Sequence, residues 1–333
     1  MTHTFKAPLP RVLLCALLGC LAPAMAIDTA AEPPPSQART LPGYHRLLLG
    51  KFEVTALSDG TVAIPLSELL TNVRPREMNT QLQRAGIDPK QAETSINAFL
   101  VHTGSRLVLV DAGGGKLFPN SGRLLASLAA AGYRPEQVTD VLISHLHPDH
   151  SAGLTRDGKA VFGKAVVHVH QQDTLFWLEP RNKGAHPDHA HVFDQAAQDL
   201  APYQTLGQVR SFTADAEIVL GVRAIAAPGH TPGHTFFRVE SEGKVLVLWG
   251  DLIHAKDLQF RSPGIAIRYD LDSRAAVAQR KAALRDAAAK GYLVGAPHIP
   301  FPGIGRVLDS GSGYEWLPVN YSETGLRRPP ATD

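Results

Sequence analysis

Cysteine is almost missing from this 333-residue chain, and its two cysteines, Cys15 and Cys20, both lie near the N-terminus. Residues 27–333 therefore offer no disulfide and no thiolate, so a core and any bound metal must stabilise them. A charge excess is missing as well. The chain has 33 basic and 31 acidic residues, and residues 1–26 hold two of the basic ones and no acidic one. The remaining 31 of each give no net charge, which argues against nucleic-acid binding.

No hydrophobic run is long enough to span a bilayer comfortably. The apolar residues 12–26 follow two basic residues, contain Pro23 and end in the tripeptide AMA. This pattern is typical of a secretory signal peptide that is cleaved after Ala26, rather than of a membrane anchor. We therefore expect a periplasmic or secreted protein. A lipoprotein processed at Cys20 is the alternative.

Residues 27–43 are rich in Pro, Ala and Ser, which predicts a flexible leader. No later stretch has a composition that would divide residues 44–333, so we expect a single catalytic domain there. That domain begins with apparent hairpins, continues with alternating strands and helices, and then returns to hairpins. This order favours the α/β class, with mixed sheets flanked by helices.

Local signals place several elements. We expect a hairpin that turns at Asp59-Gly60 and a second that turns at residues 103–105. A helix is expected over residues 121–132, capped by Ser121. Another should begin near Asp272 or Ser273 and end at Gly291.

The stretch ISHLHPDHSAG, residues 143–153, follows an apolar run and is dense in metal-binding side chains. Side chains alternate along an extended segment, so His145 and His147 point the same way and can hold one ion. Asp149 and His150 lie past the strand end and can reach a second ion. A histidine-rich surface loop is the simpler alternative.

Three later residues make that alternative a poor one. His230, Asp251 and His298 each stand at the C-terminal end of an apolar run. Imidazole and carboxylate ligands suit zinc, and they leave manganese, cobalt and iron possible.

The motif H-x-H-x-D-H, together with the isolated His230, Asp251 and His298, resembles the metallo-β-lactamase superfamily. Further segments, such as FEVTALSDGTV, LVLVDAG, GHTPGHT and PFPGIG, look like the methyl parathion hydrolase branch of organophosphate hydrolases and lactonase-like enzymes. The resemblance implies a four-layer αβ/βα sandwich and a homodimer. It also implies the following roles: His145, His147 and His230 on one metal; Asp149, His150 and His298 on the other; Asp251 bridging both with a hydroxide; Asp111 and His234 supporting these ligands.

Other histidines repeat the close spacing of His145 and His147, but no metal-binding residues elsewhere in the chain accompany them. His168 and His170 form one such pair, and His186, His189 and His191 form a cluster. We expect both sets to be exposed or to lie at the pocket rim.

Such a centre would hydrolyse esters. Two divalent ions carry more charge than Asp149, Asp251 and a hydroxide neutralise, so the site favours a transition state that gains negative charge. Both aspartates are therefore expected to be catalytic.

The choice of substrate rests on the pocket. Phe118, Trp177 and Phe193 match pocket-wall positions of the resembled branch and suit an aryl group. The pocket departs from that branch at three positions, His254, Ile267 and Tyr269. We therefore expect lactones or aryl esters to be preferred, with organophosphate triesters as weaker substrates. The alternatives are a β-lactamase, another ester or thioester hydrolase, or a non-catalytic metal-binding protein.

Overall fold

The computed structural model describes residues 1–3, 43–213 and 215–322. Contacts divide the chain into two units, residues 1–40 and 41–333, and every element below belongs to the second. The predicted signal peptide and leader lie outside the described residues, apart from residues 1–3 and 43, and stay predictions.

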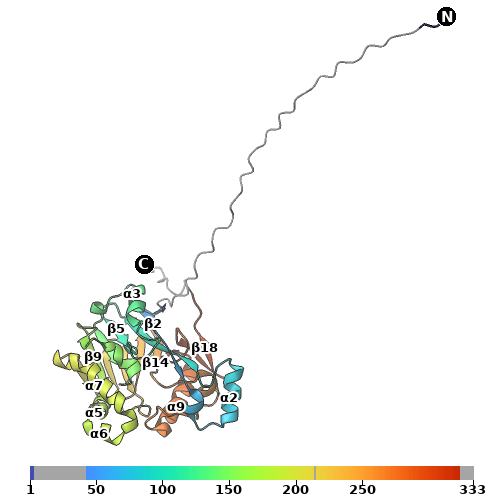
Figure 1. Cartoon of the computed structure of the whole chain (residues 1–333). Helices are drawn as coiled ribbons and strands as arrows, with labels where there is room; N and C mark the ends of the chain where they lie inside the picture. Colours follow the sequence, from blue (N-terminus) through green and yellow to red (C-terminus); the bar gives the residue numbers. More distant parts are fainter. Residues whose placement is uncertain (4–42, 214, 323–333) are drawn as a thin grey trace. The chain divides into compact units, whose positions relative to one another are not determined.

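Two large sheets organise this second unit (Figure 1). In spatial order, the described strands of the first sheet are β1 (Tyr44–Leu49), β2 (Phe52–Ile64), β4 (Ala92–His102), β5 (Leu107–Val110), β6 (Asp140–Ile143), β9 (Val166–His170) and β10 (Val209–Phe212). Those of the second sheet are β11 (Ala216–Val219), β12 (Val222–Ala226), β13 (Thr235–Ser241), β14 (Lys244–Leu248), β16 (Leu293–Gly295), β17 (Ile304–Asp309) and β18 (Tyr314–Pro318). Both sheets are mixed, since β5, β6, β9 and β10 run parallel, as do β14 and β16, while the other neighbours are antiparallel.

Apolar residues cover both faces of the first sheet. In β5, Val108 and Val110 pack into the cluster that also holds Phe237 and Leu248 of the second sheet. The alternate residues Leu107 and Leu109 pack into a different cluster, together with side chains from helices. This division follows from the two-residue period of a strand. The sheets therefore pack face to face, and helices cover the outer face of each.

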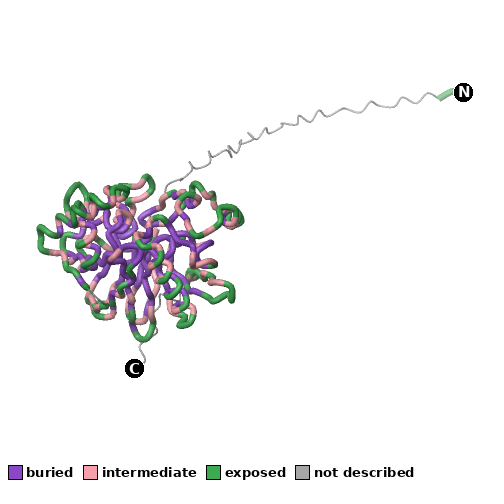
Figure 2. Tube along the Cα trace, turned by 90° about the horizontal axis from the view of Figure 1, so that it is seen from below, coloured by how far each residue is buried: buried purple, intermediate pink, exposed green. Residues whose placement is uncertain are grey.

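The helices form the outer layers. The first sheet is covered by α3 (Leu124–Ala130), α5 (Gln171–Trp177) and α7 (Ala190–Thr205), and α6 (Pro180–Ala185) lies beside α5 and α7 (Figure 1). The second sheet is covered by α9 (Ser273–Lys290), whose Ala283, Leu284 and Ala287 pack on Val247 and Val294. Buried residues accordingly gather between these layers, and exposed ones follow the outer loops (Figure 2). The order helix, sheet, sheet, helix confirms the predicted four-layer sandwich.

Short elements complete the unit. They are α1 (Leu66–Leu69), β3 (Leu70–Thr71), α2 (Pro75–Arg84), η1 (Pro135–Gln137), α4 (Pro148–Ser151), η2 (Ala152–Leu154), β7 (Thr155–Arg156), β8 (Lys159–Ala160), η3 (Pro187–His189), α8 (Lys256–Gln259) and β15 (Ala266–Ile267). Within this set, β15 pairs with β3, and α2 and α8 share a small apolar core. That core includes side chains from residues 62–65 and 265–269, so it fixes both of these segments.

The expected turn at Asp59-Gly60 is wrong. The first hairpin turns at Gly50-Lys51, and Asp59 lies inside β2, where the register with β4 shifts. The buried Asp59 carboxylate instead accepts backbone N–H bonds from Gly114 (2.9 Å) and Leu124 (2.9 Å). It thereby caps α3, a role that we had assigned to Ser121. The dipeptide Asp59-Gly60 is a local turn signal, but the N–H groups that bind Asp59 lie 55 and 65 residues further along the chain. These distant bonds outweigh the local preference for a turn.

The other local expectations are confirmed. The second hairpin connects β4 to β5. Helix α9 begins after Asp272, whose side chain accepts a bond from the N–H of Ala275, and it ends at Gly291 with φ of 64°. Within the described part of the chain, no helix has the length and apolarity that crossing a membrane requires.

Candidate metal centre

The predicted ligands come from strand ends in both sheets. The segment from His145 to His150 follows β6, Asp251 follows β14, His298 follows β16, and His230 lies in the loop between β12 and β13. Because both sheets present these ends at the same edge of the sandwich, the side chains meet there. Possible ligand atoms lie within 4.8 Å of one another in two groups. We call His145, His147, His230 and Asp251 the first group, and Asp149, His150, Asp251 and His298 the second group.

Asp251 belongs to both groups, and its two oxygens face different histidines. Oδ2 lies 3.2 Å from His230 Nε2 and 3.6 Å from His145 Nε2. Oδ1 lies 2.9 Å from His150 Nε2 and 3.0 Å from His298 Nε2. A carboxylate with one oxygen toward each group has the arrangement expected of a bridging ligand.

Several of these atoms have no hydrogen-bond partner within the described residues. His145 Nε2, His150 Nε2 and Asp251 Oδ1 are buried and lack one. The 2.9 Å approach of His150 to Asp251 is an ion-pair distance without hydrogen-bond alignment. Buried polar atoms are costly when unsatisfied, and imidazole nitrogens with carboxylate oxygens are the donor set of zinc. The residues present therefore fit a divalent metal ion in each group.

The opposite nitrogens of three histidine rings are held by acceptors. His150 Nδ1 lies 2.9 Å from Asp111 Oδ2. His230 Nδ1 lies 2.9 Å from Asp270 Oδ1, and His298 Nδ1 lies 2.8 Å from the carbonyl oxygen of Ser95. An acceptor at Nδ1 assigns the proton to that nitrogen, which turns the lone pair of Nε2 toward Asp251.

Asp111 and His234 both lie where a supporting role requires. Asp111 has a positive φ of 61° and also accepts bonds from Ser144, at its N–H (2.8 Å) and at its hydroxyl (2.9 Å). His234 uses both ring nitrogens: Nδ1 contacts the carbonyl of Ala227, and Nε2 accepts the N–H of Asp251 at 2.9 Å. Burial lowers the pKa of His234 to about 3. It has no nitrogen left for a metal, and it fixes the backbone of Asp251.

Sequence reasoning missed two buried acids. Asp270 holds His230, as described above. Asp173 accepts the N–H of Leu146 at 2.9 Å and that of Gly233 at 2.6 Å, so it joins the two ligand loops. Burial raises the pKa of Asp173 to about 6. Neither acid belongs to a motif, and only their distance from the ligand loops in the fold identifies them.

The electrostatics of the centre favour cations. Burial acts to raise the pKa of the Asp251 carboxyl, but the imidazoles of His150 and His298 hold it well below its ordinary value. Conversely, burial acts to lower the pKa of His298, and the carboxylates of Asp251 and Asp149 raise it to about 10. Ionised carboxylates thus draw positive charge into the site, and protons compete with metal ions for its nitrogens.

A cavity of about 620 Å³ opens over the two groups. His147, Asp149, Asp251 and His298 line it on the ligand side. Its apolar lining is formed by Val62, Ala63, Ile64, Pro65, Leu117, Phe118, Pro148 and Val192, and its remaining lining by Thr94, Asp188, His189, His191, Gln195, His254 and Tyr269. The volume is in the range typical of small-molecule sites.

The expected pocket residues divide into two sets. Phe118, His254 and Tyr269 line the cavity. Trp177 and Phe193 do not: they are buried between helices and sheet, where Trp177 packs its ring against His147 at 5.4 Å. Ile267 is buried in the small core beside α2. Aromatic and aliphatic side chains fit a core as well as a pocket, so residue type alone did not separate the two.

His254 lies closer to the ligands than its sequence position suggested. Its Nε2 is 3.0 Å from Asp251 Oδ2, and its ring stacks on His298 with centroids 5.1 Å apart. A proton on Nε2 is therefore donated to Asp251, which leaves Nδ1 as an acceptor. That atom is buried without a partner among the described residues. The part of His254 in substrate preference stays a prediction.

The histidines outside the motif have other roles. His189 and His191 line the cavity, as expected for rim residues. His186 packs against the ring of Phe176. His168 pairs with Asp140 at 3.1 Å. His170 is buried rather than exposed, because its Nδ1 accepts the N–H of Gln172 and caps α5.

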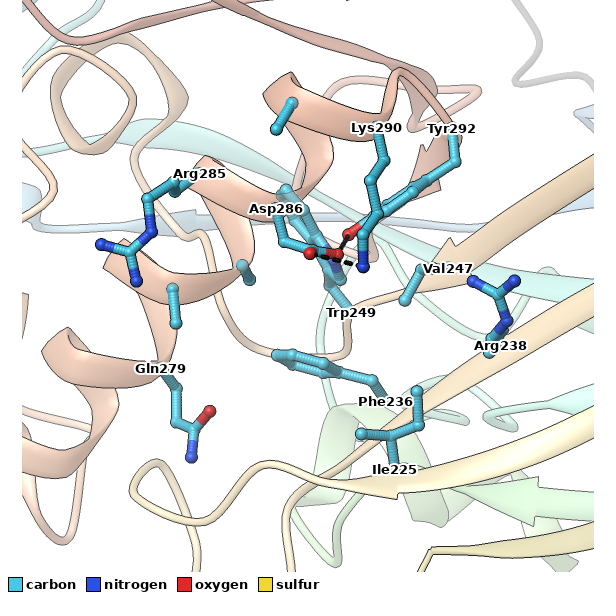
Figure 3. A pocket seen from close by; sticks show the side chains of 13 residues that line it. Ile225, Phe236, Arg238, Val247, Trp249, Gln279, Arg285, Asp286, Lys290 and Tyr292 are labelled. Atoms are coloured by element: carbon cyan, nitrogen blue, oxygen red, sulfur yellow. Dashed lines mark hydrogen bonds and ion pairs between the residues drawn. The ribbon is translucent and has the colours of Figure 1, made fainter.

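A second cavity, of about 630 Å³, lies between α9 and the outer face of the second sheet (Figure 3). Phe236, Val247 and Trp249 line its apolar part, and Arg285, Asp286 and Lys290 lie on the helix side. We call it the α9 groove. It contains none of the predicted site residues.

Comparison with known proteins gives the class. Residues 92–298 match the model of the metallo-β-lactamase superfamily. This match covers more than half of the chain, and the fold and ligand groups agree with it. The chain belongs to the metallo-β-lactamase superfamily.

Individual relatives are more specific. A structure described as hydrolase AbOPH in the beta lactamase superfamily is 34% identical and covers 86% of this chain and 100% of that chain, with a TM-score of 0.81. AidC, described as a dizinc quorum-quenching lactonase in complex with the product N-hexanoyl-L-homoserine, is 28% identical with the same coverage and a TM-score of 0.80. An N-acyl homoserine lactonase of Bacillus cereus is 25% identical over 126 residues, 38% of this chain. The chain spans 42% of the length of that lactonase. The finer resemblance to methyl parathion hydrolase stays a prediction.

Proposed function

We propose that this chain is a metal-dependent hydrolase that opens lactones and cleaves aryl esters. One observation carries the proposal: the buried carboxylate of Asp251 directs one oxygen toward each ligand group, beneath a cavity of about 620 Å³. A protein that only stored metal would have no need of an open cavity over the ligands.

The first and second ligand groups would each hold one divalent ion, with Asp251 shared. We favour zinc, because imidazole and carboxylate ligands suit it and because AidC is described as a dizinc enzyme. Manganese, cobalt and iron are the alternatives. When bound, such ions lower the pKa of a coordinated water and polarise a substrate oxygen.

The chain's own residues would orient the reaction. Hydrolysis places the hydroxyl of one water on the carbonyl carbon, and the ester oxygen leaves with the remaining proton. Asp149 lines the cavity, and 20% of its side chain is exposed, against 3% for Asp251. We assign the transfer of this proton to Asp149 and the fixed negative charge to Asp251.

The cavity wall suits an acyl lactone. Val62, Ile64, Leu117 and Phe118 give one side an apolar surface that can cover an acyl chain or an aryl group. Lactonases among the relatives support the same class. Organophosphate triesters are proposed as weaker substrates, because Tyr269 and His254 narrow the cavity beside Asp251 and place polar atoms there.

A side-by-side rate comparison tests the proposal. The zinc-loaded protein would be assayed on dihydrocoumarin, an acyl-homoserine lactone, paraoxon, methyl parathion and nitrocefin. We expect kcat/KM to be largest for a lactone, smaller for the two phosphotriesters and negligible for nitrocefin. Protein that holds two zinc ions and turns over neither lactone would contradict the proposal, and nitrocefin as the best substrate would favour a β-lactamase.

A further inference from the structure

Arg280 of α9 is fully buried, which is rare for a side chain that is always charged. Its guanidinium donates from Nε to the carbonyl of Leu252 at 2.7 Å and from Nη1 to the carbonyl of Ile265 at 2.6 Å. A longer bond from Nη1 reaches Pro263 at 3.3 Å. Burying this charge is favourable only if the bonds keep their geometry.

These carbonyls belong to two loops that build the centre. Leu252 directly follows Asp251, and the same loop carries His254. Pro263 and Ile265 belong to residues 261–272, which also carry Tyr269 and Asp270. One planar guanidinium therefore joins the loop of the shared carboxylate to the loop of a cavity residue.

The second loop also reaches a predicted ligand. Asp270 Oδ1 lies 2.9 Å from His230 Nδ1. Asp270 Oδ2 lies 3.9 Å from Arg280 Nη2, an ion-pair distance, and Nη2 is buried without a hydrogen-bond partner among the described residues. In addition, the N–H of Leu271 donates to the carbonyl of His230 at 3.1 Å. A continuous series of contacts thus runs from α9 through Asp270 to the ring of His230.

The second group draws its support from elsewhere. His150 is held by Asp111, at the end of β5, and His298 by the carbonyl of Ser95 in β4. Neither contact involves α9 or residues 261–272. A disturbance at Arg280 should therefore reach the first group more strongly than the second.

Gln259 offers an internal comparison. Its Oε1 accepts the N–H of His254 at 2.8 Å and that of Ala255 at 3.0 Å, and its Nε2 donates to the carbonyl of Ile265 at 3.2 Å. It connects the same two loops, but no contact extends from it to Asp270. Loop support and the orientation of His230 can therefore be separated by comparing Gln259 with Arg280.

We propose that Arg280 is a positioning residue that sets metal affinity at the first ligand group more strongly than at the second, through its ion pair with Asp270, which orients His230 toward Asp251. The inference rests on the metal assignment proposed above. It adds a helix residue, remote from the cavity, to the residues that determine the properties of the centre.

The test measures zinc affinity at each site by competition with a chelator, on the full protein loaded with two zinc ions. Arg280→Lys keeps the charge but lacks the planar fork, so it cannot bond Leu252 and Ile265 together. We expect affinity at the first site to fall about ten- to hundredfold, the usual effect of losing a partner behind a ligand, and affinity at the second site, which shares Asp251, to fall clearly less. Cobalt-loaded protein should show altered visible absorption mainly from one ion.

Four further variants make the result decisive. Asp270→Asn should reproduce the selective loss, and combining it with Arg280→Lys should add little, because both act on His230. Arg285→Lys, on the exposed side of the same helix, and Gln259→Met should leave the ratio of the two affinities unchanged.

Equal weakening of both sites, in parallel with a lower melting temperature, would show that Arg280 is only structural. Unchanged affinities in Arg280→Lys and Asp270→Asn would overturn the inference alone. Wild-type protein that fails to take up two zinc ions would overturn the proposed function as well.

Discussion

Two cavities have nearly equal volumes, about 620 Å³ over the strand ends that carry the candidate ligands and about 630 Å³ between α9 and the outer face of the second sheet. Buried apolar side chains, Phe236, Val247 and Trp249, line part of the α9 groove. Among its charged side chains, Asp286 contacts Lys290 at 2.7 Å and accepts a bond from Tyr292 (Figure 3). The groove borders one buried polar atom without a hydrogen-bond partner among the described residues, Trp249 Nε1. The cavity over Asp251 borders two, Asp251 Oδ1 and His254 Nδ1, and the ligand groups hold two more, His145 Nε2 and His150 Nε2. Convergent unsatisfied polar atoms, and not volume, therefore distinguish the candidate site.

The largest expected effect comes from the shared carboxylate. Asp251→Asn removes the negative charge that faces both ligand groups, so zinc content should fall at both sites and kcat/KM on lactones by several orders of magnitude. Metal analysis and rates on one preparation check this. His186→Ala, which alters a histidine that packs on Phe176, is the matched control and should change little. Comparable losses in the two variants would contradict the ligand assignment.

A smaller effect is expected from His254, which lines the same cavity without belonging to either ligand group. His254→Leu replaces a polar ring by an apolar side chain, and such an exchange changes relative rates by roughly ten- to hundredfold. We expect kcat/KM to rise for methyl parathion and to fall for dihydrocoumarin, with zinc content unchanged. A ratio that stays within about twofold would show that His254 does not select the substrate.

The sequence predicted the layers and the meeting of the candidate ligands, because both depend on local patterns. Alternation in segments such as Leu107–Val110 assigns each side chain to one of two cores. Likewise, the candidate ligands lie in segments that follow β6, β12, β14 and β16, and strand ends converge in this fold. Residue type and position along the chain were sufficient for both.

What sequence reasoning missed depends on distant partners. Asp270 lies 40 residues from His230, and Asp173 lies 60 residues from Gly233, so no spacing marks either acid. Arg280 resembles any helix arginine until its carbonyl partners are known. Trp177 was misplaced for a related reason: whether an aromatic side chain faces the core or the cavity depends on how its helix is turned on the sheet.

Two buried acids, Asp251 and Asp199, have pKa values that are shifted in opposite directions. Histidines hold the pKa of Asp251 well below its ordinary value, whereas burial raises the pKa of Asp199, which contacts Ser151 and Gln195, to about 6. The unfolded chain releases the Asp199 proton near pH 4, so between about pH 4 and 6 the folded protein holds a proton that the unfolded chain has lost. The contribution of Asp199 to stability therefore falls as pH rises through that window.

Asp199→Asn removes this titration. Relative to wild type, the variant should gain on the order of 2–3 kcal/mol in unfolding free energy between pH 4.5 and 7.5, the value of a shift of about two pKa units. The difference in melting temperature should grow by several degrees over the same range, at roughly 2–4 °C per kcal/mol. A difference that is constant with pH would mean that Asp199 ionises normally.

The smallest effect is expected in the α9 groove, and it tests the opening comparison directly. Ala282→Trp fills the groove from an exposed helix position, and Leu117→Trp narrows the cavity over Asp251 from its exposed rim. Both changes add the same side chain at an exposed site, so general costs of the substitution should be alike. Because only Leu117 borders the ligands' cavity, we expect its variant to lower kcat/KM on an acyl lactone, mainly through KM. The Ala282 variant should stay within about twofold of wild type, a change small on the scale of lost substrate contacts. Equal losses from the two variants would mean that the groove also serves catalysis and that unsatisfied polar atoms do not distinguish the site.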